Sequence, residues 1–225
     1  MPPIRTSEDR VGVLAEFYNQ TSDALLDLAK TPWPERKTQC KLLGINPYIF
    51  RTMVDYSRYP EARKLNKLIR QCGRRIAGMK VLDFGCLVAD YGVFLARRGA
   101  KVAVYDYIEE ITFAAFRFTR ENMPVELFHV PHNYKELMCS RNLVIFGEVL
   151  EHLDNPLQPL EACVDASVDF IFTSCFPLGD EAYFSHSGHS KSAQQQQPAC
   201  LALLRKFYYE IAARKKARLW RRIVV

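Results

Sequence analysis

The stretch that decides the fold reads Val81-Leu82-Asp83-Phe84-Gly85-Cys86-Leu87-Val88-Ala89-Asp90. A short apolar run ends in an aspartate, and a helical pattern begins at Asp90. Gly85 lets the backbone turn sharply and approach a ligand. In open α/β sheets, ligands bind beyond the carboxyl ends of the strands. The stretch therefore predicts a first strand, a ligand-binding turn and a helix.

Strand and helix patterns alternate on the carboxyl side of this stretch. The expected strands cover 80–84, 101–106, 125–130, 142–147 and 168–174, and the expected helices cover 90–98, 109–122 and 157–166. Alternation of this kind specifies parallel βαβ units with helices on both faces of the sheet. We therefore expect an α/β fold over 78–225, with a Rossmann-like, doubly wound and mostly parallel sheet.

The chain before residue 78 has a helical pattern instead. Apolar residues between 10 and 30 recur at steps of three and four, which predicts one helix that ends at Thr31-Pro32-Trp33-Pro34. Pro60 suits the first turn of a later helix. The buried stripe of that helix consists of Leu65, Leu68, Ile69 and Cys72. We expect residues 1–77 to form an N-terminal helical cap.

The end of the chain is basic. Residues 201–225 hold eight Lys or Arg and one Glu, whereas the other 200 residues are about neutral. Residues 185–198 contain four consecutive glutamines and predict a flexible loop. We expect a long basic helix over 199–220 and a short last strand over 221–225. This helix could hold a protein or RNA partner, or it could simply be solvated.

Composition excludes several classes of protein. The chain has 225 residues, of which 48% are hydrophobic and 25% charged, and its net charge is +6. These values are those of a globular domain rather than a disordered chain. No apolar run is long enough to span a membrane, and the start does not resemble a secretory signal. Seven scattered cysteines without a CxxC pair suggest reduced thiols and a cytoplasmic location.

Two further segments follow strand ends. Asp106 ends the second strand, 23 residues after Asp83, where an acid can accept both hydroxyls of a ribose. After the fourth strand comes Glu148-Val149-Leu150-Glu151-His152-Leu153-Asp154-Asn155-Pro156.

These three elements, in this order and spacing, resemble class I methyltransferases that use S-adenosylmethionine (SAM). The resemblance covers residues 78–176 and implies SAM as cofactor, with S-adenosylhomocysteine (SAH) as product. It also implies where the cofactor lies: Asp83 orients the loop and the methionine amine, Asp106 holds the ribose, and Asn133 stands near the adenine. The implied cofactor-binding residues are Asp83, Phe84, Gly85, Cys86, Leu87, Asp106, Tyr107, Asn133 and Glu148.

The chain departs from the pattern of this family. The family loop reads acid-x-Gly-x-Gly-x-Gly, and this chain has Leu87 and Ala89 at the second and third glycines. A leucine cannot adopt a positive φ cheaply. Asp165-Ala166-Ser167 replaces the Pro-Gly-Gly of the family. These departures favour a second hypothesis, in which the protein is a catalytically inactive binding or assembly module.

The segment after the fourth strand supplies the catalytic candidates, which are Glu148, Glu151 and His152. If the segment is helical, these three residues share one face. We expect methylation of oxygen or nitrogen on a small molecule, with His152 as a general base and no metal. A third hypothesis is a metal-assisted RNA methyltransferase, because the same residues, completed by a later histidine such as His189, resemble the metal site of small-RNA methyltransferases.

Overall fold

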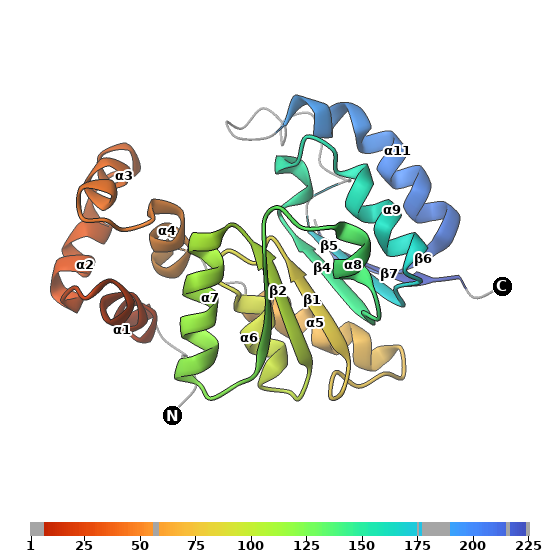
Figure 1. Ribbon diagram of the computed structural model, residues 1–225, viewed down its shortest axis with the longest axis horizontal. Coiled ribbons are helices and arrows are strands. Elements are labelled where there is room, and N and C mark those ends of the chain that lie inside the picture. The colour runs from red at the N-terminus through yellow and green to blue at the C-terminus, as the bar shows by residue number, and fades with distance from the viewer. Residues whose placement is uncertain (1–6, 56–58, 175, 177–189, 215–216, 224–225) are drawn as a thin grey trace.

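The computed structural model describes residues 7–55, 59–174, 176, 190–214 and 217–223. They build one seven-stranded sheet in the order β3-β2-β1-β4-β5-β7-β6, with helices around it (Figure 1). The strands are β1 Lys80–Phe84, β2 Lys101–Asp106, β3 Val125–His129, β4 Leu143–Gly147, β5 Phe170–Ser174, β6 Tyr208–Arg214 and β7 Ala217–Arg222. The first five lie within two residues of their expected positions.

Strand direction determines where a ligand can bind. Strands β1 to β5 are all parallel, and only β7 runs against its two neighbours, β5 and β6. The order reverses beside β1, which pairs with β2 on one side and β4 on the other. The carboxyl ends of β1, β2 and β4 therefore meet at the topological switch point, where ligands bind in such sheets. The expected mostly parallel, doubly wound sheet is confirmed.

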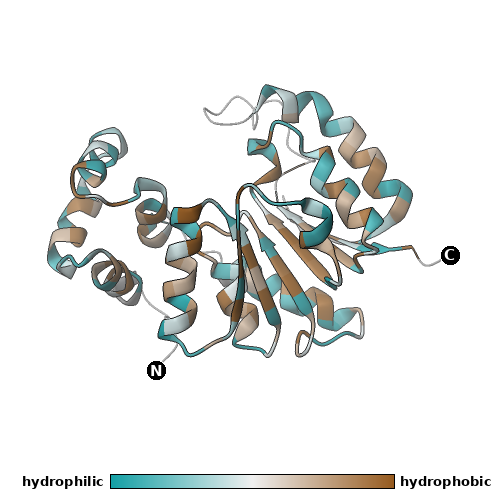
Figure 2. Cartoon of the chain, in the orientation of Figure 1, coloured by the Kyte–Doolittle hydropathy of each residue, from teal (hydrophilic) through white to brown (hydrophobic). Residues whose placement is uncertain are grey.

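Helices cover both faces of the sheet. On one face lie α5 Tyr59–Gln71, α6 Asp90–Ala96 and α7 Ile108–Arg120. On the other face lie α8 Tyr134–Met138, α9 Leu157–Asp165 and α11 Lys191–Phe207. Figure 2 shows the strands as the most hydrophobic part of the chain, between more polar helices. Both sheet faces are buried, so the central strands are apolar on both sides.

Four N-terminal helices pack beyond α7 (Figure 1). They are α1 Ser7–Tyr18, α2 Ser22–Lys30, α3 Trp33–Leu42 and α4 Pro47–Asp55. We call these four helices the cap. Their apolar cluster includes Phe113 of α7 and Val88 of the β1–α6 loop. Helix α5, which the expected boundary at residue 77 places in the cap, instead covers the sheet through Leu65 and Ile69.

The expected single helix over 10–30 is wrong, because two helices occupy this stretch. Asn19 has a left-handed φ of 51°, which ends α1. Thr21 then caps α2, since its hydroxyl accepts a hydrogen bond from the Ala24 N–H at 3.2 Å. The apolar stripe continues across the break, which is why periodicity alone did not reveal it.

The expectations for the C-terminal segment need correction. Helix α11 begins at Lys191, so the glutamines expected in a loop are helical. It ends at Phe207, and the expected basic helix over 199–220 is instead the end of α11 followed by the β6–β7 hairpin. Tyr208 and Trp220 are buried against the sheet, so packing overrides the helix propensity of the Ala-, Arg- and Lys-rich sequence. The expected last strand over 221–225 lies earlier, as β7.

Among the described residues, the helices are too short or too polar to cross a membrane.

Candidate functional site

The β1–α6 loop keeps the backbone of a glycine-rich turn with few glycines. Gly85, Leu87 and Ala89 have φ values of 69°, 48° and 54°. Leu87 and Ala89 therefore adopt the left-handed conformation at the positions where the family has glycine. Ser167, at the last position of the missing Pro-Gly-Gly, has a φ of 58°. Each non-glycine residue in the left-handed conformation lowers the stability of the fold by about 1–2 kcal/mol, which surrounding contacts must offset.

Hydrogen bonds hold the loop in this shape. The Leu87 N–H donates to Asp106 Oδ2 at 2.7 Å, which ties the loop to the end of β2. The Ala89 N–H donates to the Cys86 carbonyl at 2.6 Å. The guanidinium of Arg117 in α7 donates to the Val88 carbonyl. The loop is thus fixed on both sides by tertiary contacts rather than by glycine content.

The Leu87 side chain packs against the cap. It is half-buried beside the cluster that contains Val88, Phe113 and the apolar faces of α1 and α4. From the family pattern, this branched side chain is expected at a position where the backbone lies against the cofactor. The structure instead gives the side chain a place in the cap interface, while the backbone keeps its turn.

A buried cluster of charges joins the cap to the loop. Asp90, the first residue of α6, accepts hydrogen bonds from Arg10 of α1 at 3.0 Å and from Arg117 at 2.9 Å. Arg10 also donates to the carbonyls of Thr52 and Met53 near the end of α4. Sequence reasoning missed this cluster. The sequence pattern that could have revealed it is an arginine within the apolar stripe of a helix, which occurs at Arg10 and again at Arg117.

Asp83 anchors α6 on β1. Its side chain is buried, and its Oδ2 accepts a hydrogen bond from the Gly92 N–H at 2.9 Å. The pKa of this carboxyl is raised from 3.8 to about 7, mainly by burial and in smaller part by the nearby Asp90 and Asp106 carboxylates. Asp83 thus fixes the helix that follows the loop, and its expected role in orienting the loop and the methionine amine stays a prediction.

Asp106 lies at the carboxyl edge of the sheet with spare hydrogen-bonding capacity. Its Oδ2 accepts from Leu87 and its Oδ1 accepts from the Tyr107 N–H at 2.8 Å. Each carboxylate oxygen has a second lone pair, so both can also accept from a ligand hydroxyl. Burial raises the pKa of Asp106 to about 6. Beside it, Tyr107 and Ile108 are 65% and 60% exposed, which leaves apolar surface for a flat ring.

Two other expected cofactor residues, Phe84 and Cys86, have buried side chains. Phe84 is 1% exposed and packs among Tyr105, Tyr134 and Phe146 on the α8–α9 face, because strand alternation turns it away from Asp83. Cys86 is buried in the core beside α6, and burial raises its pKa. The side chains of Phe84 and Cys86 therefore lie in the core, and contact of these two residues with the cofactor stays a prediction.

Asn133 lies after β3, at the start of α8. Its side chain accepts a hydrogen bond from the Lys135 N–H at 2.9 Å and so caps the helix. The residue is exposed, and a contact with adenine stays a prediction.

Comparison with solved structures gives many matches of this fold. Magnesium protoporphyrin IX methyltransferase (ChlM) from Synechocystis PCC 6803, with bound SAM, has a TM-score of 0.51 and 13% identity, and the match covers 98% of both chains. The N-terminal domain of EvdMO1, with SAH bound, has a TM-score of 0.53 and 16% identity, over 74% of this chain and 82% of that one. The chain has the fold of the class I methyltransferases. Neither a protein-family model nor a curated protein matches its sequence.

The segment after β4 of this methyltransferase fold does not form the expected helix face. Only Leu150–His152 form a 3-10 turn, and Glu148 precedes it with a φ of 59°. Glu151 is fully buried while His152 is exposed, so these side chains point to different environments. The prediction that Glu148, Glu151 and His152 share one helix face is therefore wrong. The described residues contain no group of three His, Cys, Asp or Glu that could hold a metal, and His189 lies outside them.

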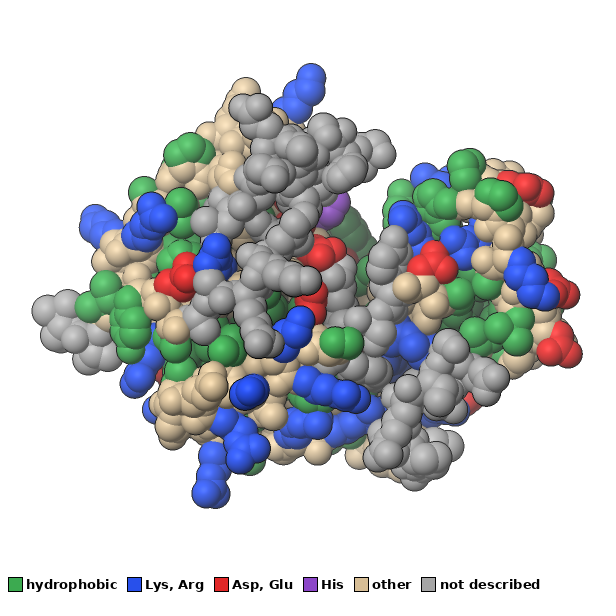
Figure 3. All heavy atoms as spheres, turned by 180° about the vertical axis from the view of Figure 1, so that it is seen from behind, with side chains coloured by type: hydrophobic (Ala, Val, Ile, Leu, Met, Phe, Trp, Pro, Cys, Tyr) green, Lys and Arg blue, Asp and Glu red, His purple; other side chains and the backbone are tan. Residues whose placement is uncertain are grey.

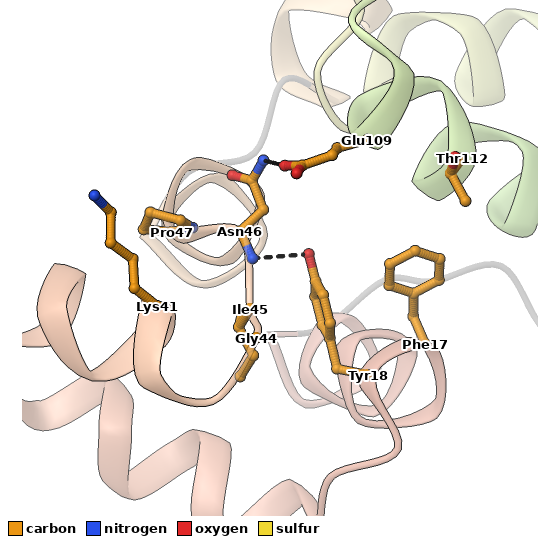
Figure 4. A pocket seen from close by; sticks show the side chains of 9 residues that line it. All are labelled: Phe17, Tyr18, Lys41, Gly44, Ile45, Asn46, Pro47, Glu109 and Thr112. Atoms are coloured by element: carbon orange, nitrogen blue, oxygen red, sulfur yellow. Dashed lines mark hydrogen bonds between the residues drawn. The ribbon is translucent and has the colours of Figure 1, made fainter.

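A cavity of about 500 Å³ lies between the cap and α7 of the methyltransferase fold. Asn46 lies at its centre (Figure 4): its backbone N–H donates to the Tyr18 hydroxyl, and its side chain donates to Glu109 at 2.8 Å. Burial raises the pKa of Tyr18 to about 12, so its hydroxyl stays protonated at neutral pH. These bonds give the cap a second attachment to α7, besides the charges around Asp90.

Proposed function

We propose that this chain binds SAM and transfers its methyl group to an oxygen or nitrogen of a small molecule. The observation that carries the proposal is the bond between the Leu87 N–H and Asp106 Oδ2. It joins the left-handed loop after β1 to the acid after β2, the two elements that hold the cofactor in this fold. The SAM- and SAH-bound structures of the same fold support this assignment.

The residues at the carboxyl edge fit the parts of this cofactor. Asp106 accepts the ribose hydroxyls, and the exposed Tyr107 and Ile108 offer apolar surface to the adenine. Asp83 anchors α6, which follows the loop, on β1 through the Gly92 N–H. When bound, SAM supplies a methyl group on an already positively charged sulfur. Catalysis is then mainly the positioning of the acceptor.

His152 is the general base in this proposal. It is exposed in the turn after β4, next to the switch point of the sheet, so an acceptor can reach it. A hydroxyl or ammonium acceptor must lose a proton, and an imidazole can take it near neutral pH. Glu148 directly follows β4 and begins the same loop. The family resemblance implies that it lies beside the cofactor. The buried Glu151 does not contact the acceptor.

The test is calorimetric titration of the purified full chain with SAH. We expect saturable binding, and Asp106→Asn should weaken it about tenfold or more, because hydrogen bonds to a charged group contribute about 1.5–3 kcal/mol each. Asp165→Asn is the matched control. It makes the same chemical change at an exposed site at the end of α9, beyond the amino-terminal edge of β5.

Two results would contradict the proposal. Equal SAH affinity in Asp106→Asn and the wild type would show that the ribose lies elsewhere. A chain that melts cooperatively but binds neither SAM nor SAH would favour the non-catalytic module instead.

A further inference from the structure

A second, smaller cavity lies between α5 and the strands β5 and β7. Its volume is about 140 Å³. Its apolar side is formed by Leu68 of α5, Phe172 of β5 and Ala217 of β7. Pockets that bury a complete drug-sized ligand are about 300–1,000 Å³, so this one holds only one end of a molecule, such as a ring or a short chain.

Two lysines form the exposed side of this cavity. Lys64 and Lys67 lie three residues apart on α5, so they are neighbours on the helix surface. Within the part of the chain that the structure describes, neither ammonium group forms an ion pair. The lining also holds one carboxylate, Glu61, which accepts a hydrogen bond from the Tyr91 hydroxyl, so two cations and one anion leave it with a net positive charge. A net positive charge beside apolar surface fits a ligand that is both anionic and apolar.

The surface around the cavity is also positive. Residues 59–75 contain six Lys or Arg and one acid, Glu61. Arg74, three residues after α5, has its guanidinium 3.8 Å from Asp169 Oδ2. The Asp169 carbonyl accepts a hydrogen bond from the backbone N–H of Arg222 in β7. The basic residues that follow α5 therefore lie beside those of the β6–β7 hairpin. Figure 3 shows Lys and Arg side chains gathered across the lower part of the face seen from behind. Such a surface attracts anions toward the cavity.

The cavity is one side chain away from the end of β4. Glu61, which lines it, accepts a hydrogen bond from the Tyr91 hydroxyl at 2.5 Å. The Tyr91 ring packs against Phe172 with centroids 5.6 Å apart. The same ring touches Gly147, where an added Cβ would lie 2.7 Å from Tyr91 Cε2. Gly147 directly precedes Glu148, so the cavity adjoins the edge where the acceptor must lie.

We propose that this cavity binds the acidic end of the methyl acceptor, a carboxylate or phosphate attached to an apolar ring or chain, through Lys64 and Lys67. The inference rests on the proposed methyl transfer and narrows its substrate to small organic anions. Gln71 adds an amide N–H donor for the acid, whereas the Glu61 carboxylate, which Tyr91 holds, repels it and keeps it toward the lysines.

The test uses simple probes of this chemistry on the full chain. Benzoate and phenyl phosphate represent the two acids, and benzyl alcohol is the uncharged probe, with binding measured by ligand-observed NMR. We expect both anions to bind and benzyl alcohol not to bind. The double variant Lys64→Gln/Lys67→Gln should weaken anion binding about tenfold. The matched control, Lys80→Gln/Lys101→Gln, removes two exposed lysines at the amino-terminal ends of β1 and β2.

The outcomes separate this inference from the proposed function. Anion binding that both double variants weaken equally, or binding of benzyl alcohol as tight as that of benzoate, would overturn the site. So would binding of an RNA oligonucleotide that displaces the probes equally well from the wild type and from Lys64→Gln/Lys67→Gln. SAH titration of the same variants should be unchanged. A wild-type chain that binds the anions but does not bind SAH would refute the proposed methyl transfer and leave the anion site standing.

Discussion

Asp83 combines a structural bond with an unusual charge state. It holds the Gly92 N–H at the start of α6, yet it is buried close to two other carboxylates. Burial is the main reason that its pKa rises to about 7. The carboxyl group therefore binds its proton more tightly in the folded chain than in the unfolded chain, where the ordinary value of 3.8 applies.

This difference predicts how stability depends on pH. Between the two pKa values the folded state carries more protons, so the free energy of unfolding falls as pH rises from about 4 to about 7 and then levels. Asp83→Asn removes this contribution and should be more stable than the wild type by more than about 1 kcal/mol above pH 7. Urea unfolding of both proteins across this pH range checks it. Parallel curves for the two proteins would contradict it, and Asp165→Asn should follow the wild type.

The chain order of strand ends predicted which residues gather at the carboxyl edge of the sheet, but not the contacts among them. Asp83, Gly85 and Asp106 follow from strand ends, because the carboxyl edge of a parallel sheet gathers them. The buried state of Phe84 also follows from alternation along β1, once the strand register is known. The left-handed φ of Leu87 could not be predicted, because it depends on Asp106, Arg117 and the cap, which are distant in sequence.

Helix α1 is tied to α6 and α7 by ion pairs of two kinds. The Arg10–Asp90 pair has side chains only 6% and 1% exposed, and Arg10 also bonds two carbonyls near the end of α4. The Arg120–Glu16 pair, which also joins the cap to α7, has side chains 25% and 53% exposed. Buried pairs are costly to break, because one charge is left without compensation, whereas exposed pairs contribute little.

The two arginines therefore make a matched comparison. Arg10→Lys keeps the charge but cannot reach both oxygens of Asp90 and the carbonyls at once, so we expect a loss of about 3 kcal/mol. Arg120→Lys should cost less than about 1 kcal/mol. Urea unfolding at constant pH measures both. Similar losses in the two variants would show that the buried cluster does not hold the cap.

Helix α11 and the hairpin show where sequence patterns mislead. The run of glutamines looks like low complexity, but Gln196 donates to the carbonyl of Asp154 and to Ser192, which fixes it in a helix. The Ala-, Arg- and Lys-rich end favours a helix locally. It forms β7 because that strand pairs with β5 and places Trp220 against Thr173, a long-range gain that no local pattern contains.

The cap and the sheet domain share one apolar cluster. Val88 and Phe113 of the sheet domain are buried among residues of α1 and α4, and the charges around Asp90 cross the same boundary. Neither part can be removed without exposing the other. This sharing predicts a single cooperative unfolding unit, although the sequence divides into two segments.

Differential scanning calorimetry tests this prediction. We expect one transition, with the calorimetric enthalpy equal to the van't Hoff enthalpy. Arg10→Lys should lower the midpoint of that transition without splitting it. A separate low-temperature transition for the cap, in the wild type or in the variant, would contradict the prediction.

The position of Arg10 has a consequence for synthesis on the ribosome. Its partner Asp90 is 80 residues further along the chain, and Phe113 follows later still. At about 5–20 residues per second, Asp90 is made about 4–16 s after Arg10 and about 2–7 s after α4, the last cap helix, is complete. During that time the apolar faces of the cap helices and the Arg10 guanidinium lack the surface that covers them. A nascent chain of this protein should therefore depend on chaperone holding early in translation, before any cofactor loop exists.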